Sequence, residues 1–274
     1  MLRDITIGQH LPGSSPLHRL DPRLKILLTI AFIVMLFVGT NPLGIALSLL
    51  FLLFCYTLAR IPARMMWKSM KPLIPIIAVT AILNLLFIPG EPIFKVWILS
   101  ISLEGVRYAI LLAVRIVALI LGASLLTYTT SPIILTDAIE RLLSPLARFR
   151  FPAHELAMMM TIALRFIPTL IEETDKIMSA QKARGAELDN GTLVQRVKAL
   201  VPVLIPLFLS AFRRADELAL AMECRCYRGG EGRTRLRQLH IGPSDIVMTL
   251  LCVAYFVLIG FSGYLYGLLA GALA

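Results

Sequence analysis

The sequence predicts an all-α membrane protein with about five transmembrane helices and a cytosolic arm of long amphipathic helices. Hydrophobic residues make up 58% of the 274 residues and charged residues only 16%, whereas soluble domains have about 25% charged residues. The mean hydropathy is +0.81. Apolar residues form long runs separated by charged stretches, which is typical of membrane spans rather than of an oversized soluble core.

Five apolar runs approach the length of about 20 residues that a spanning helix needs. The run 24–38 ends at a Gly-Thr-Asn-Pro turn, and the run 43–59 follows at once, so the two predict a helical hairpin. The later runs are 72–88, which stops at a Pro-Gly pair, 105–128, and a last run that begins after the Pro-Ser-Asp sequence at 243–245 and continues to about 266.

Basic residues in the short loops predict the orientation, because cytosolic loops are rich in Lys and Arg. The segment before the first run and the loop 60–71 are basic, whereas the turn 39–42 is uncharged. We therefore expect a multi-pass protein of the plasma membrane with a cytosolic N-terminus, no cleavable signal peptide, and the arm in the cytosol. The expected parts are 1–128 (helices 1–4), 129–240 (coupling-helix arm) and 241–274 (last span).

The arm is predicted to be helical although it carries 16 basic and 12 acidic residues. A short helix follows Thr136, and Pro152 suits the first turn of a long helix with apolar residues at helical spacing. Pro168 is expected to kink that helix, and Gly185 to end it. Another helix begins near Thr192. Such apolar surface must contact other helices, the membrane or partner proteins.

Two of these helices end in an arginine between small residues. One end is Ala183, Arg184 and Gly185, and the other is Cys224, Arg225 and Cys226. Small neighbours let another backbone approach, and the guanidinium offers a planar, permanently charged fork to a carboxylate or carbonyls. The alternative is that arginine is simply common at helix ends, where it suits the helix dipole.

Three stretches together resemble one family. Residues 8–25 look like the N-terminal signature of the transmembrane T component of energy-coupling factor (ECF) transporters, which includes the membrane subunits of cobalt and biotin uptake systems. The two arginine helix ends look like that family's coupling motifs, although Cys224 and Cys226 depart from the usual small residues.

The resemblance implies a non-catalytic coupling subunit of an ATP-driven importer of vitamins or transition-metal ions. Two ABC-type ATPase subunits would bind ATP and Mg²⁺, one docked at Arg184 and the other at Arg225, and this chain would hold no cofactor of its own. A separate membrane subunit, the S subunit, would bind the substrate. Adaptable or apolar arm residues expected to contact it are Met158, Met159, Leu204, Leu207 and Phe208.

Other functional classes find less support in the residues. The chain has four histidines and no acid-rich motif of a membrane enzyme, and no internal repeat of a stand-alone secondary transporter. Cys224 and Cys226 lack the second pair of ligands that a structural zinc site needs. The charge of +10 suits cytosolic loops, and no nucleic-acid motif accompanies it. Arg115 lies deep in an apolar run, and we expect it to pair inside the bundle, with Asn84 as the best polar candidate.

Overall fold

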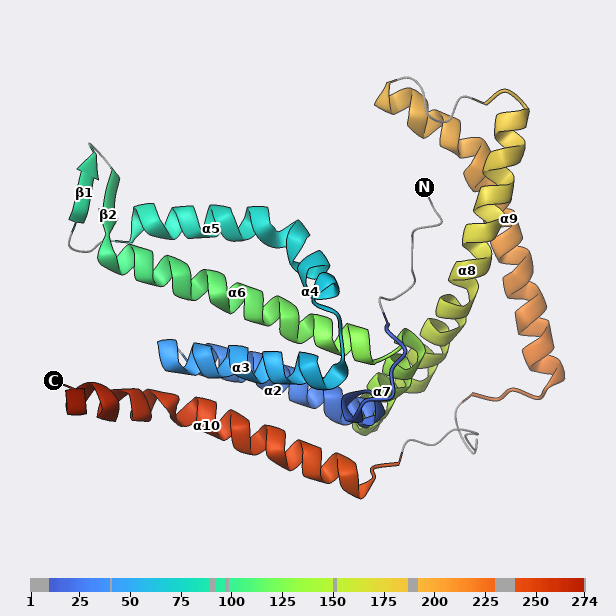
Figure 1. Cartoon of the computed structure of the whole chain (residues 1–274). Coiled ribbons are helices and arrows are strands. Elements are labelled where there is room, and N and C mark those ends of the chain that lie inside the picture. The colour runs from blue at the N-terminus through green and yellow to red at the C-terminus, as the bar shows by residue number, and fades with distance from the viewer. Residues whose placement is uncertain are drawn as a thin grey trace. The chain divides into compact units, whose positions relative to one another are not determined.

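The computed structural model describes residues 10–39, 41–88, 92–96, 99–149, 152–186, 192–229 and 240–273. Almost all of them are helical (Figure 1). They divide into two compact units. The bundle unit contains residues 10–135 and 240–273, and the arm unit contains residues 136–229. The boundary falls inside a helix, α7 (Pro132–Leu143).

The bundle unit carries the predicted spans, and the arm unit carries the two arginine helix ends. Its described elements are α1 (Pro16–Arg19), α2 (Pro22–Val38), α3 (Pro42–Ala59), α4 (Ala63–Met70), η2 (Lys71–Leu73), α5 (Ile74–Phe87), β1 (Pro92–Val96), β2 (Leu99–Ser102), α6 (Leu103–Thr129) and α10 (Pro243–Leu273). The arm unit contains the rest of α7, then η3 (Ser144–Phe149), α8 (Ala153–Ala183) and α9 (Leu193–Cys224).

Local sequence signals account for most helix starts. Proline occupies the first turn of α2 and α3, where its missing N–H costs no hydrogen bond. The Asp21 carboxylate caps α2 by accepting the Arg23 backbone N–H at 2.8 Å. Thr192 and Gln195 form a reciprocal capping box at the start of α9, which confirms the predicted start near Thr192.

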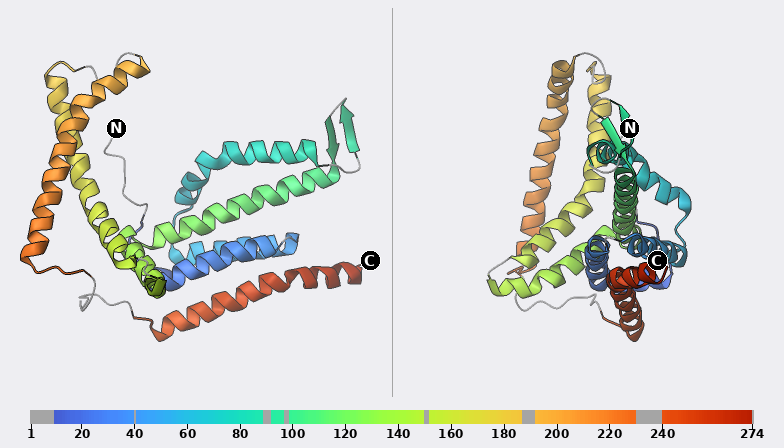
Figure 2. Two further views of the ribbon diagram at one scale, coloured as in Figure 1. Left: turned by 180° about the vertical axis from the view of Figure 1, so that it is seen from behind. Right: turned by 90° about the vertical axis from the view of Figure 1, so that its left-hand side faces the viewer.

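The core of the bundle unit lies between α2, α3, α6 and α10, which pack side by side (Figures 1 and 2). Phe32, Phe51 and Phe256 form a cluster of aromatic rings with centroids 5.3–6.1 Å apart. Gly122 on α6 lets the Phe32 ring approach, because an added Cβ would lie 2.8 Å from that ring. The only strands among the described residues form a short antiparallel hairpin, in which β1 pairs with β2 before α6.

Among the described residues, five helical segments are long and apolar enough to cross a membrane: Pro42–Ala59, Ala63–Phe87, Leu103–Thr129, Ala153–Ala183 and Pro243–Tyr264. Their number matches the prediction, but the set differs. The first predicted span is α2, which has 17 residues and a length of about 26 Å against a hydrocarbon core of about 30 Å. The least apolar of the five, α8, belongs to the arm unit.

Arg115 pairs within the bundle unit, but not with Asn84, so that part of the prediction is wrong. Its Nη2 donates to the Gly39 carbonyl at 3.4 Å, and its guanidinium lies 5.9 Å from the centre of the Phe37 ring. The Asn84 amide instead donates to the Thr80 carbonyl of its own helix at 2.7 Å. Gly39 follows the last turn of α2, where free carbonyls attract a cation.

Candidate functional site

The C-terminus of α8 is a Schellman motif with Arg184 as its capping residue. Gly185 follows with φ of +85°, and its N–H donates to the Lys182 carbonyl at 3.0 Å. The Ala186 N–H reaches back to the Gln181 carbonyl at 3.0 Å. These two hydrogen bonds satisfy carbonyls that the helix end would leave unpaired. Gly185 therefore ends α8, as predicted.

The C-terminus of α9 repeats this geometry around Arg225. Cys226 occupies the left-handed position with φ of +54°, and its N–H donates to the Glu223 carbonyl at 2.8 Å. The Tyr227 N–H donates to the Met222 carbonyl at 3.0 Å. Glycine normally fills this position because a Cβ strains it. Cys226 therefore carries backbone strain that Gly185 avoids.

The two arginines occupy equivalent positions. Arg184 has φ and ψ of −83° and 5°, and Arg225 has −92° and 15°. Both side chains are exposed. Neither guanidinium makes an ion pair within the part of the chain that the structure describes. Each helix thus presents a free cation beside its last carbonyls.

The helices α8 and α9 pack against each other within the arm unit (Figure 1). The Glu173 carboxylate accepts the Ser210 hydroxyl at 2.5 Å and pairs with Arg214 at 2.7 Å. Val203 is buried and Leu207 is half-buried on the same helical face of α9 as Ser210 and Arg214. One face of α9 therefore binds α8.

A second contact joins the end of α8 to α9 and depends on a proline. Pro206 has no N–H to donate to the Pro202 carbonyl, so that carbonyl lacks its helical partner. The Gln181 side-chain amide donates to it at 3.3 Å. Gln181 lies three residues before Arg184, so this contact fixes the arginine end of α8 against α9.

These contacts place the two arginine ends far apart. Gln181 contacts α9 at residue 202, whereas Glu173 contacts it at 210 and 214, so the two helices run in opposite directions at this contact. The 23 residues from Pro202 to Arg225 correspond to about 35 Å of helix. The arrangement therefore offers two separate docking ends rather than one composite site.

The residues predicted to contact the substrate-binding subunit fall on different faces. Met159 of α8 and Leu204 and Phe208 of α9 are exposed, with Phe208 61% exposed. Met158 and Leu207 are half-buried, and Leu207 lies on the side of α9 that binds α8. The exposed apolar face of α9 contains more residues than the three that were predicted on this helix. It also contains Val201, Ile205, Leu209 and Phe212.

The N-terminal stretch 10–25 is fastened to the end of α6 inside the bundle unit. Lys25 is buried, with 7% of its surface exposed. Its ammonium donates to the carbonyls of His18 and Thr129 at 3.0 and 3.1 Å and to the Thr130 hydroxyl at 3.3 Å. These three acceptors match its three N–H donors. The Leu11 N–H adds a bond to the Tyr128 carbonyl at 2.9 Å.

His18 holds the loop before α1 in place. Its Nε2 donates to the Leu11 carbonyl at 3.1 Å, so its Nδ1 accepts from the Ser15 hydroxyl at 2.7 Å in the neutral ring. Burial and the nearby Lys25 charge lower the pKa of His18 from 6.5. An alanine Cβ at Gly13 would lie 2.7 Å from this ring, so an alanine there would displace the ring that holds the loop.

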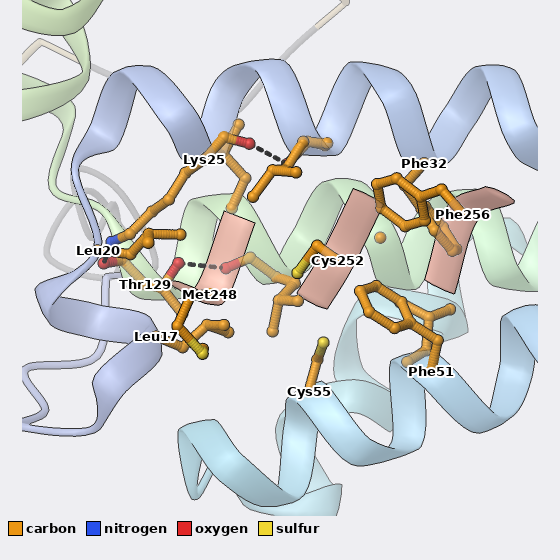
Figure 3. Close-up of a pocket in the computed structure, with 16 residues that line it drawn as sticks. Leu17, Leu20, Lys25, Phe32, Phe51, Cys55, Thr129, Met248, Cys252 and Phe256 are labelled. Atoms are coloured by element: carbon orange, nitrogen blue, oxygen red, sulfur yellow. Dashed lines mark hydrogen bonds between the residues drawn. The ribbon is translucent and has the colours of Figure 1, made fainter. Parts of the chain in front are cut away.

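A pocket of about 60 Å³ lies between Lys25 and the aromatic cluster (Figure 3). Lys25 and Thr129 stand at one end, Phe51 and Phe256 at the other, and the thiols of Cys55 and Cys252 between them. The rest of the lining is mostly apolar, with leucine the commonest residue. Cys224 and Cys226 are exposed free thiols. Within the described residues no three His, Cys, Asp or Glu side chains gather as metal ligands.

Comparison with known proteins identifies the family. Residues 13–236 match the family model CbiQ, described as cobalt transport protein. The energy-coupling factor transporter transmembrane protein EcfT of Thermosediminibacter oceani is 55% identical over 89% of this chain and 92% of its own length. EcfT of Acidaminococcus fermentans is 51% identical over 95% and 97%, and that of Bacillus subtilis 46% over 93% and 97%. The chain belongs to the CbiQ family, the T components of ECF transporters. As a T component it is a transmembrane part of such a transporter.

Two features of this T component have no strong signal in its sequence. The hydrogen bond between Gln181 and α9 depends on a carbonyl freed by Pro206, and only the proline spacing hints at it. The bonds from Lys25 to Thr129 and Thr130 cross more than a hundred residues, which no local pattern predicts.

Proposed function

We propose that this T component is the non-catalytic coupling subunit of an importer for vitamins or transition-metal ions. Two cytosolic ATPases bind ATP and Mg²⁺ and dock at Arg184 and Arg225, and this chain binds no cofactor. A membrane S subunit supplies the substrate site. The N-terminus and the arm unit lie in the cytosol of a cell whose plasma membrane holds the bundle unit.

One observation supports this proposal most strongly. Both long arm helices end in the same Schellman geometry, and each places an exposed arginine at its capping position. Arginine is common at helix ends. That preference alone does not explain why both helices combine an arginine at the capping position with the same backbone conformation. A pair of equivalent ends suits two equivalent partners, as two ATPases are.

The contacts between α8 and α9 suggest how motion passes between partners. Glu173 pairs with Arg214 and Gln181 with the Pro202 carbonyl, so a displacement of either arginine end is carried to the other helix. The exposed apolar face of α9, which includes Leu204 and Phe208, then moves with it. That face is where we place the S subunit.

The test reverses one arginine charge at a time. Arg184→Glu and Arg225→Glu are each expected to remove one ATPase from the complex purified on this chain, and the double variant both. Loss of a buried interfacial charge costs about 2–5 kcal/mol, which weakens binding by at least about thirtyfold. Arg165→Glu and Arg213→Glu, which change exposed arginines within the same helices, serve as matched controls.

The measurement is the ATPase content of the purified complex, followed by uptake in proteoliposomes. Full ATPase content in the double variant would refute docking at these ends. A second pull-down with Leu204→Glu and Phe208→Glu should keep both ATPases and lose the S subunit.

A further inference from the structure

The segment between α3 and α5 carries a basic and aromatic face that no partner in the bundle unit occupies. The exposed side chains share one side of α4 and its two ends: Arg60, Arg64, Trp67, Lys68 and Lys71. Arg64, Trp67, Lys68 and Lys71 follow one another at helical spacing and share one helical face, whereas Arg60 precedes α4 at the end of α3. Trp67 is 62% exposed. The segment 60–88 contains no Asp or Glu.

The opposite face of α4 is fixed to the bundle. Met65, Met66 and Met70 pack against the core. The hydroxyl of Tyr128, a buried residue of α6, donates to the Met65 carbonyl at 3.1 Å and shares a short hydrogen bond with the Ser69 hydroxyl. These contacts fix α4 to the bundle, so its basic face points away from the core.

The level of α4 along the membrane normal follows from its neighbours. α3 carries no charged residue from Pro42 to Ala59, and residues 72–88 carry none either. Both runs must lie in hydrocarbon, so the charged turn between them lies at the membrane surface. Tryptophan and basic side chains are the residues that settle at this level, with the ring among headgroups and the cations at phosphates.

The backbone at Arg60 supplies an independent indication. Arg60 has φ of +56°, a conformation that glycine adopts without strain and arginine does not. Its N–H donates to the Thr57 carbonyl at 3.1 Å to end α3. An open space of about 590 Å³ between residues 11–16 and 57–60 lies beside it. An arginine in a strained backbone conformation indicates a functional role for its side chain.

We propose that this face, Arg60 to Lys71, binds the headgroups of anionic phospholipids in the leaflet that adjoins it. The charges are all positive, the ring is exposed at headgroup level, and the neighbouring space accepts a phosphate and its glycerol. The cytosolic leaflet, which the predicted orientation places here, is the one that carries anionic lipids. The bound lipids anchor the start of α5, no residue of which is buried within the bundle unit.

The sequence offers a direct probe, because it contains only two tryptophans, Trp67 and Trp97. In a Trp97→Phe background, the fluorescence of Trp67 reports lipids in contact with it. The full-length chain is reconstituted in nanodiscs that contain brominated phosphatidylglycerol or brominated phosphatidylcholine at equal mole fraction. We expect stronger quenching by the anionic lipid at low salt, and a smaller preference at high salt.

Charge variants separate this proposal from ordinary lipid contact. Arg64→Gln with Lys68→Gln should lower the preference for the anionic lipid by up to about fivefold per charge. Arg64→Lys with Lys68→Arg should keep it. Arg165→Gln with Lys176→Gln removes the same charge from α8 and should also keep it.

Equal quenching by both lipids, or a preference that survives the Arg64 and Lys68 neutralisation, would overturn the proposal. The same quenching measurement on the complex with its ATPases tests whether a protein partner, rather than lipid, covers this face. If brominated lipid no longer reaches Trp67 there, a protein partner covers this face and the lipid proposal is wrong.

Discussion

The two arginine helix ends allow a matched test of backbone strain. Gly185 and Cys226 occupy equivalent left-handed positions with φ of +85° and +54°. An added Cβ at Gly185 meets nothing within 4 Å, and Cys226 is exposed, so substitutions at both positions change backbone strain with little change in packing. Left-handed strain costs a non-glycine residue about 1–2 kcal/mol, and the extra freedom of unfolded glycine offsets about 0.4–1 kcal/mol. The net difference is about 1 kcal/mol.

Gly185→Ala should therefore loosen the last turn of α8, and Cys226→Gly should tighten the last turn of α9. About 1 kcal/mol corresponds to a fivefold change in protection of the terminal amides, which hydrogen exchange of the peptides around 180–186 and 221–227 measures. Cys226→Ala removes the thiol but keeps the strain, so it should leave protection near that of the natural chain. If Cys226→Gly leaves α9 protection unchanged, or if Cys226→Ala raises it equally, the strain reasoning is wrong.

Three further predictions concern contacts inside single units. Lys25→Met should lower the free energy of unfolding by at least about 3 kcal/mol, because three acceptors lose a charged donor, and an unchanged melting temperature in detergent would contradict this. Gln181→Leu should cost about 1 kcal/mol, but much less in a Pro206→Ala background, where residue 206 regains an N–H for the same carbonyl; a double-mutant cycle that gives no coupling would exclude this contact. Folding lowers the pKa of His18 from 6.5, so the unfolded chain binds the proton more readily. Stability present above about pH 6.5 should then fall as the pH is lowered towards the folded pKa, and less so in His18→Gln, when melting is followed from pH 7.5 to 5.5.

The predictable part of this fold is the part specified by neighbours in sequence. The helix start at Thr192 and the glycine stop at Gly185 each act within a few residues, and the structure has both. Pro152, predicted in the first turn of α8, is instead its N-cap residue. The number of candidate spans matches the prediction, but the set of helices does not. Membrane crossing depends on length and composition together, and α2 is short whereas α8 is long and only moderately apolar.

The candidate site shows a similar division. The sequence predicts which residues stand at the two helix ends, because the small-Arg-small pattern is local. It does not predict that Cys226 adopts a left-handed conformation, since cysteine has no preference for it. Nor does it predict which face of α9 turns towards α8. Pro202 and Pro206 interrupt the helical hydrogen bonds within an almost wholly apolar run, so hydrophobic periodicity has little polar contrast to detect there.

Arg115 illustrates how helix length changes the meaning of a buried charge. Arg115 lies near the middle of α6, a helix of 27 residues. From that position alone, its expected partner is a polar side chain on a facing span. Its neighbour is instead the end of α2, a helix of 17 residues whose last carbonyls lie beside the guanidinium. The turn between α2 and α3 thus lies within reach of the Arg115 side chain. Because these carbonyls lack helical partners, the cation and the helix end each supply what the other needs. The partner of Arg115 therefore depends on where α2 ends, which is a property of another helix, and side-chain polarity alone pointed wrongly to Asn84.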